Sequence, residues 1–191
     1  MAASAPRETV CVFGASWAQP GTPLYAESEA LGAAIAAAGF SVITGGYTGC
    51  MEATAKGCAG AGGGATGVLV PTLFPARDAA GNPFNTAVVN TPTLLSRIDA
   101  MLLAAPRLLV ALPGTLGTLT ELMCAWNVAM LAPVGGYAAA TIVAWRKPWQ
   151  AILEHAGEAL GLSAEQRALV VYVDSVAECV AALRARAARS D

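Results

Sequence analysis

The sequence has few charged residues, a single histidine and no paired cysteine motif. Charged residues make up 13% of its 191 positions, 11 basic against 13 acidic, and the formal net charge is −2. Because Lys and Arg form no cluster, the chain lacks the cations that a DNA- or RNA-binding protein places against phosphates. With His155 alone and no CxxC spacing among the five cysteines, no zinc site of known spacing can be assembled, and we expect no metal.

Long apolar runs are also missing, although 55% of the residues are hydrophobic. Glycine, proline or charge interrupts each run before the roughly 18 residues of a membrane-spanning helix, so no membrane partner is expected. The first residues, MAASAPRE, lack the apolar core of a secretory signal, which predicts a cytoplasmic location and reduced cysteines. The surplus of apolar surface predicts a homo-oligomer, most simply a homodimer.

Strand and helix signals alternate along the chain. Short apolar runs predict strands, and helical spacing or cap residues predict helices. The predicted strands are 9–16, 41–46, 65–71, 86–90, 107–114, 140–145 and 170–174, and the predicted helices are 24–38, 49–62, 91–105, 118–131, 148–160 and 175 onward. This alternation indicates an α/β fold, a Rossmann-like doubly wound parallel sheet with helices on both faces. We expect residues 1–8 to form a flexible tail and residues 9–191 a single Rossmann-like nucleotide-binding domain.

Ligands of such sheets bind at the carboxyl ends of the strands, where this sequence has three candidate turns. The turn PGTLGT joins a predicted strand to a helix that is expected to begin at Thr118. Gly114 and Gly117 allow a ligand to approach the backbone, and the free N–H groups of the first helical turn form an anion site. Thr115 and Thr118 add hydroxyl donors, and Glu121 lies one turn further, within reach of a sugar.

A second interpretation of this turn needs no ligand. Thr118 and Glu121 have the T-x-x-E spacing of a capping box, in which side chains satisfy the first N–H groups of a helix. The same spacing occurs at two other helix starts, Ser163/Gln166 and Ser175/Glu178. A cap does not require Gly114 and Gly117, and these glycines favour the binding site.

The other two turns have fewer distinctive residues. TGGYTG has spacing suited to close approach of backbone to a phosphate or ribose, although a tight turn with positive φ explains its glycines equally well. GAS offers one hydroxyl donor. The candidate contacts from these turns are Gly14, Ser16, Gly45, Gly46, Tyr47 and Gly49. A GxGxxG match at Gly62, Gly64 and Gly67 precedes a strand instead of following one, so it does not fit a dinucleotide site, and there is no P-loop motif.

Together these turns resemble the lonely-guy family, the cytokinin riboside 5′-monophosphate phosphoribohydrolases. The family pattern GGGxxGLMG is similar to GGYTGCME at 45–52, and PGGxGTxxE is similar to PGTLGTLTE at 113–121. The MxxRK helix of the family corresponds to LLSRI at 94–98. The resemblance extends from about Val10 to the strand near Trp145.

The resemblance implies an activity and the residues that perform it. The activity is hydrolysis of the N-glycosidic bond of a nucleoside 5′-monophosphate, such as a cytokinin nucleotide or AMP, without a cofactor. Glu121 would stabilise the oxocarbenium-like transition state and orient water, and Arg97 would hold phosphate or ribose oxygens. The glycine turns would form the nucleotide cradle. A modified Rossmann dimer with the site near the subunit interface is also implied.

Three residues depart from the family patterns. Tyr47 and Thr115 stand where the family has glycine, and Ile98 stands where it has lysine. The larger side chains narrow the space beside a ligand, and the lost cation predicts weaker phosphate binding. Two further classes therefore stay open: a carrier or sensor of a phosphorylated ligand, such as a molybdenum-cofactor carrier, and a structural protein in which every motif is a turn or cap.

Overall fold

The computed structural model describes residues 8–74, 80–105, 107–135 and 140–188. These residues form one seven-stranded sheet in which every neighbouring pair is parallel. The strands are β1 (Thr9–Phe13), β2 (Ser41–Thr44), β3 (Ala65–Leu69), β4 (Ala87–Asn90), β5 (Leu108–Ala111), β6 (Thr141–Trp145) and β7 (Val170–Val173). Their order across the sheet is β4-β3-β2-β1-β5-β6-β7. All seven predicted strands are present, and β1 begins at the predicted Thr9. The predicted tail lies outside the described residues except for Glu8.

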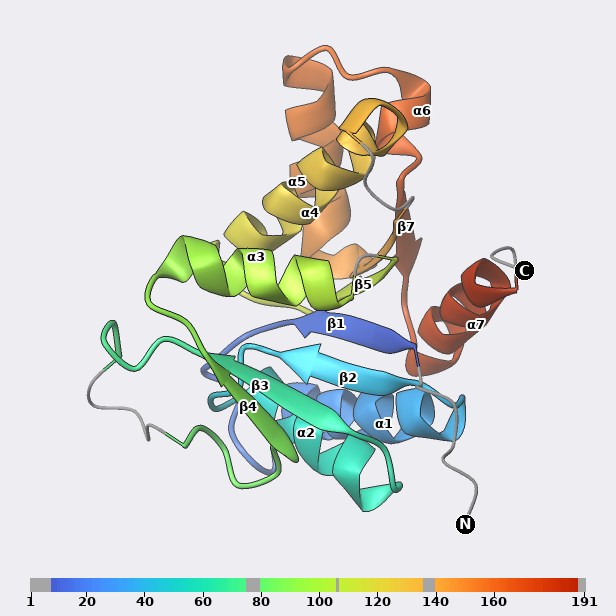
Figure 1. The fold of residues 1–191 in the computed structure, drawn as a ribbon. Helices are drawn as coiled ribbons and strands as arrows, with labels where there is room; N and C mark the ends of the chain where they lie inside the picture. The colour runs from blue at the N-terminus through green and yellow to red at the C-terminus, as the bar shows by residue number, and fades with distance from the viewer. Residues whose placement is uncertain (1–7, 75–79, 106, 136–139, 189–191) are drawn as a thin grey trace.

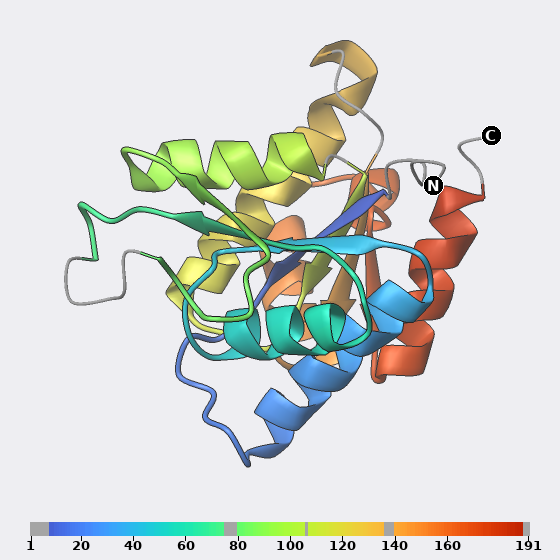
Figure 2. The same cartoon turned by 60° about the horizontal axis from the view of Figure 1, so that its bottom comes forward.

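Helices cover both faces of the sheet. Within the described ranges they are α1 (Pro23–Ala37), α2 (Cys50–Gly60), α3 (Leu94–Ala104), α4 (Leu116–Gly135), α5 (Arg146–Ala159), α6 (Ala164–Arg167) and α7 (Val176–Ala187). Helices α1, α2 and α7 lie on one face, and α3, α4 and α5 lie on the other (Figure 1; Figure 2). The predicted doubly wound Rossmann-like fold is therefore confirmed. None of these helices has the length and hydropathy needed to cross a membrane.

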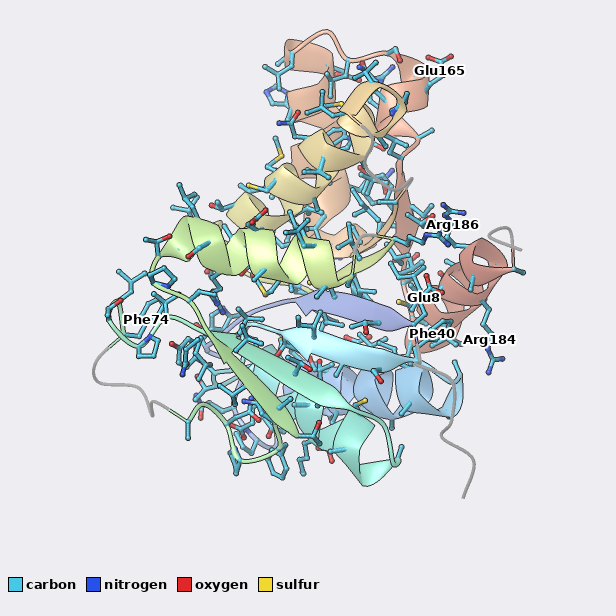
Figure 3. The ribbon with its side chains drawn as sticks, in the orientation of Figure 1. Glu8, Phe40, Phe74, Glu165, Arg184 and Arg186 are labelled. Carbon is cyan, nitrogen blue, oxygen red and sulfur yellow. The ribbon has the colours of Figure 1, made fainter. Side chains whose placement is uncertain are left out.

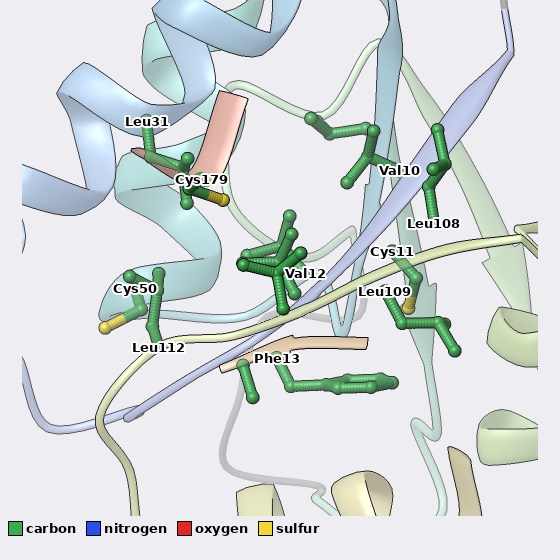
Figure 4. Packing of buried hydrophobic residues seen from close by; sticks show 14 of the residues in the cluster. Val10, Cys11, Val12, Phe13, Leu31, Cys50, Leu108, Leu109, Leu112 and Cys179 are labelled. Atoms are coloured by element: carbon green, nitrogen blue, oxygen red, sulfur yellow. The ribbon is translucent and has the colours of Figure 1, made fainter. Parts of the chain in front are cut away.

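The core lies around the two central strands, β1 and β5. Their apolar residues are buried because helices cover both sides, and Figure 4 shows Val10, Val12 and Phe13 packed with Leu108 and Leu109. The cysteines are free, and four of them, Cys11, Cys50, Cys58 and Cys179, are buried in this packing as small hydrophobic residues. Cys124 is partly exposed.

Three local features differ from the sequence prediction. Helix α4 begins at Leu116, two residues before the predicted Thr118, and continues past residue 131 through Pro133 to Gly135. The short helix α6 was not predicted as a helix, although its Ser163/Gln166 capping box forms. Strand β4 is exposed along its whole length because it is the edge of the sheet, although a sheet with helices on both faces predicts covered strands.

Candidate functional site

The three candidate turns meet between β1 and β5, where the order of strands along the chain reverses. Strands β1 and β5 are neighbours, but the chain continues from β1 to β2 on one side and from β5 to β6 on the other. The backbone N–H of Ala15, after β1, donates to the Pro113 carbonyl, after β5, at 3.1 Å. The N–H of Cys50, which opens α2, donates to the Ala15 carbonyl at 2.8 Å. Doubly wound sheets bind their ligands at this switch point.

A pocket of about 210 Å³ opens at these turns. Seven of the residues predicted to form the site line it: Gly14, Ser16, Arg97, Thr115, Gly117, Thr118 and Glu121. They come from the turns after β1 and β5 and from helices α3 and α4, which are separated in the sequence. The structure thus brings the predicted catalytic pair and the predicted anion site to one cavity.

Arg97 and Glu121 contact each other at the wall of this pocket. Nη1 of Arg97 lies 3.4 Å from Oε1 of Glu121, and the two residues are only 6% and 9% exposed. Arg97 also donates from Nε to the Val68 carbonyl and from Nη2 to the Gly45 carbonyl, both at 2.9 Å. These bonds fix the guanidinium plane, so its Nη1 edge meets the glutamate.

Burial changes the acidity of Glu121. Removal from water raises the pKa of its carboxyl group from 4.5 to about 7, and the positive charge of Arg97 opposes part of this rise. The carboxyl group therefore exchanges its proton near neutral pH. A group with this property in a pocket is suited to proton transfer or to charge stabilisation.

The capping-box interpretation of Thr118 and Glu121 is wrong. Because α4 begins at Leu116, Thr118 lies inside its first turn, and Leu119 N–H donates to the Thr115 carbonyl at 2.9 Å. The carboxylate of Glu121 turns to Arg97 instead of back to the helix start. The N–H groups at the start of a helix have no partner within that helix, and here they lie beside the pocket-lining Gly117 and Thr118.

The remaining predicted contacts lie behind the pocket wall. Gly45, Gly46, Tyr47 and Gly49 are buried, and Gly114 packs under Thr118. A Cβ atom on Gly45 would overlap Nη2 of Arg97, and one on Gly49, whose φ is +77°, would overlap the Ala15 carbonyl. In this structure their missing side chains allow protein segments to approach one another, not a ligand. Tyr47 does not narrow the pocket, because its side chain points into the interior.

Several pocket residues were not predicted from the sequence. They are Met51, Phe74, Leu94, Ile98 and Thr120. Met51 comes from α2, and Phe74 comes from the long loop after β3, near the start of α3 (Figure 3). The helical spacing of Leu94 and Ile98 around Arg97 was the one signal in the sequence that could have placed them on the same face. These side chains give the cavity an apolar wall.

Comparison with known families identifies the relationship. The profile of the SLOG cluster4 family matches residues 7–179. The chain belongs to the SLOG cluster4 family. This is a lonely-guy-like family, so the resemblance that the turn motifs indicated is confirmed. No curated protein has significant similarity to the sequence.

Solved structures share the fold of this SLOG cluster4 protein. The molybdenum cofactor carrier protein of Chlamydomonas reinhardtii superposes with a TM-score of 0.72 and 22% identity, covering 95% of this chain and 99% of that one. The molybdenum cofactor binding protein of Rippkaea orientalis gives a TM-score of 0.71, 20% identity and coverage of 95% and 98%. The structural-genomics target TM1055 superposes with a TM-score of 0.70 and 23% identity, covering 93% of this chain and 98% of that one. At these identities the likeness establishes the fold.

Proposed function

We propose that this protein hydrolyses the N-glycosidic bond of a nucleoside 5′-monophosphate to a free base and ribose 5-phosphate. The observation that carries the proposal is the position of Glu121. Its buried carboxyl group lines the pocket at the topological switch point, in contact with Arg97 and one turn from the start of α4. A carboxylate in this position can stabilise positive charge on a sugar whose phosphate is held by the helix.

Each part of the pocket has a role in this proposal. The N–H groups of the first turn of α4, with the hydroxyl groups of Thr115 and Thr118, hold the phosphate. Arg97 directs Nη1 to the sugar and to Glu121, which stabilises the oxocarbenium-like transition state and orients water. The apolar wall of Phe74 and Leu94 contacts the base. This arrangement uses no metal ion or redox cofactor.

The test is an assay for base release. The protein is incubated with AMP and with an isopentenyl-substituted AMP, and free base is measured by chromatography. We expect stoichiometric base and ribose 5-phosphate from at least one nucleotide, and no base from the corresponding nucleoside without phosphate. Absence of base release from every nucleotide tested would refute the hydrolase.

A carrier of a phosphorylated ligand is the second candidate. Two observations favour it: Arg97 and Glu121 are bonded to each other, and two structures with this fold are a molybdenum cofactor carrier and a molybdenum cofactor binding protein. A carrier would be stabilised thermally by the nucleotide without releasing base, because a ligand that binds only the folded state raises its melting temperature. A structural protein would give neither response.

We further propose that the protein is a homodimer with the site near its interface. Helices α3 and α4 carry large exposed apolar side chains; Leu95, Leu116 and Val134 are 73%, 76% and 83% exposed. An apolar groove of about 560 Å³ runs along α4 and includes Leu116 and Thr120, next to the pocket. Such surface is usually covered by a partner.

Sedimentation equilibrium should give twice the chain mass of 19.2 kDa, and Leu95→Asp with Leu116→Asp should give the monomer. A monomeric wild-type protein would exclude this assembly.

A further inference from the structure

The guanidinium group of Arg97 is held from several directions by parts of the protein that do not contact the pocket. The Val68 and Gly45 carbonyls, at the ends of neighbouring strands, fix Nε and Nη2. Its Cζ atom lies over the aromatic ring of Tyr47, 5.7 Å from the ring centroid. The ring face carries partial negative charge and attracts the cation. With these sides occupied, Nη1 is directed to Glu121.

Tyr47 is itself fixed by three contacts. Its hydroxyl oxygen accepts a hydrogen bond from the Val70 N–H at 2.9 Å, and its backbone carbonyl accepts one from Nδ2 of Asn82 at 3.0 Å. Its ring and the ring of Phe74 pack in a T-shaped arrangement, with centroids 5.4 Å apart and planes at 73°. The residue is 3% exposed. Its ring is therefore a rigid surface for the guanidinium group.

We propose that Tyr47 is a positioning residue, whose ring holds the Arg97 guanidinium group in the orientation that presents Nη1 to Glu121. The lonely-guy pattern has glycine at this place, which offers no ring, so this chain uses a different support for the same arginine. The role of Tyr47 in turnover rests on the proposed hydrolase activity, but the geometry of the pair can be measured without it.

The pKa of the Glu121 carboxyl group depends on the position of Arg97. Among the described residues, the titratable groups that face it are Arg97 from α3, the Cys11 thiol from β1 and the Cys124 thiol from α4 itself. Burial raises the pKa of both thiols, so they are neutral at pH 7. Arg97 is the cation among these groups, and moving it away from Glu121 raises the pKa of the carboxyl group.

The test is a carboxyl ¹³C NMR titration of the ligand-free protein, with the Glu121 signal assigned by its loss in Glu121→Gln. Tyr47→Leu removes the ring, and we expect the pKa of Glu121 to rise by about one unit. Tyr47→Phe keeps the ring and removes only the hydroxyl acceptor, and we expect the wild-type value. Should Tyr47→Leu fail to fold, Tyr47→Met replaces it, because its longer, flexible side chain adapts to the space of the ring. Equal pKa values in the wild type and the ring-less variant would overturn the proposal.

Turnover provides the second readout. Tyr47→Leu should lower kcat about tenfold with little change in KM, while Tyr47→Phe retains kcat, because a misplaced guanidinium group affects the transition state more than ground-state binding. A loss of kcat in both variants would show that the hydroxyl bond to Val70, not the ring, is required. If the wild-type protein releases no base, the hydrolase proposal fails and the carboxyl titration still decides the role of Tyr47.

Discussion

Glu121→Gln is expected to lower kcat for base release from a nucleoside 5′-monophosphate by about a hundred- to a thousand-fold. The substitution keeps the size of the side chain and its contact with Arg97 but removes the negative charge that stabilises the developing cation on the sugar. Chromatographic measurement of free base in single-turnover reactions gives the comparison directly. The variant should still bind nucleotide, because the phosphate is held at the start of α4. The rise in melting temperature on addition of nucleotide measures this binding.

The matched control is Glu158→Gln. Glu158 is an exposed glutamate on α5, 3.8 Å from Arg167, and its side chain is outside the pocket. Its substitution should leave kcat unchanged.

In the wild-type protein kcat/KM should rise with pH and level off above about pH 8, because burial raises the pKa of Glu121 to about 7 and the reaction uses the ionised form. Near-normal base release by Glu121→Gln would show that the reaction does not require the carboxylate.

Arg97→Met is expected to lower the free energy of unfolding by about 4 kcal/mol at pH 8. The substitution leaves the buried Glu121 carboxylate without its cation and removes the guanidinium bonds to the Val68 and Gly45 carbonyls. At pH 5 the loss should be smaller by about 2 kcal/mol, because the carboxyl group is then protonated in the folded state of both proteins. Urea unfolding at the two pH values measures the difference.

The sign of this pH dependence follows from the pKa of Glu121. Burial raises it from 4.5 in the unfolded chain to about 7 in the folded protein, so stability falls as pH rises through this window. Arg97 lowers the folded-state pKa, and without it the fall continues to higher pH. The control is Arg146→Met, since Arg146 forms an exposed pair with Asp174 at 2.7 Å and its loss should have little effect at either pH. An equal loss at pH 5 and pH 8 for Arg97→Met would show that the two charges are not coupled.

Much of the fold could be predicted from local sequence. The strands around Val10, Val42 and Leu109 are short apolar runs between helical segments, and this pattern determines a parallel sheet covered on both faces. The predicted start of α4 rests on the T-x-x-E spacing of Thr118 and Glu121, whereas the helix begins at Leu116. The carboxylate of Glu121 contacts Arg97 on α3 instead of the helix start, and no local pattern specifies this contact between elements.

The candidate site could be predicted in part for a similar reason. The turns after β1 and β5 reach the pocket because strand ends of a parallel sheet meet at one edge, which spacing alone indicates. The direction of a side chain within a turn is not specified in this way. Tyr47 turns inward because Val70 offers an N–H donor and Arg97 a cation, both from other elements. Phe74 reaches the pocket from a loop whose sequence shows no periodicity.

The absence of a side chain at Gly45 leaves the space that the Arg97 guanidinium group occupies behind the pocket wall. Any larger residue at position 45 would displace Arg97, so a substitution there cannot change the ligand without disturbing the ion pair. Leu94 and Thr120 also line the pocket, where both are exposed, and neither belongs to the ion pair. Libraries that diversify these two positions would explore ligand preference while Arg97 and Glu121 stay in place.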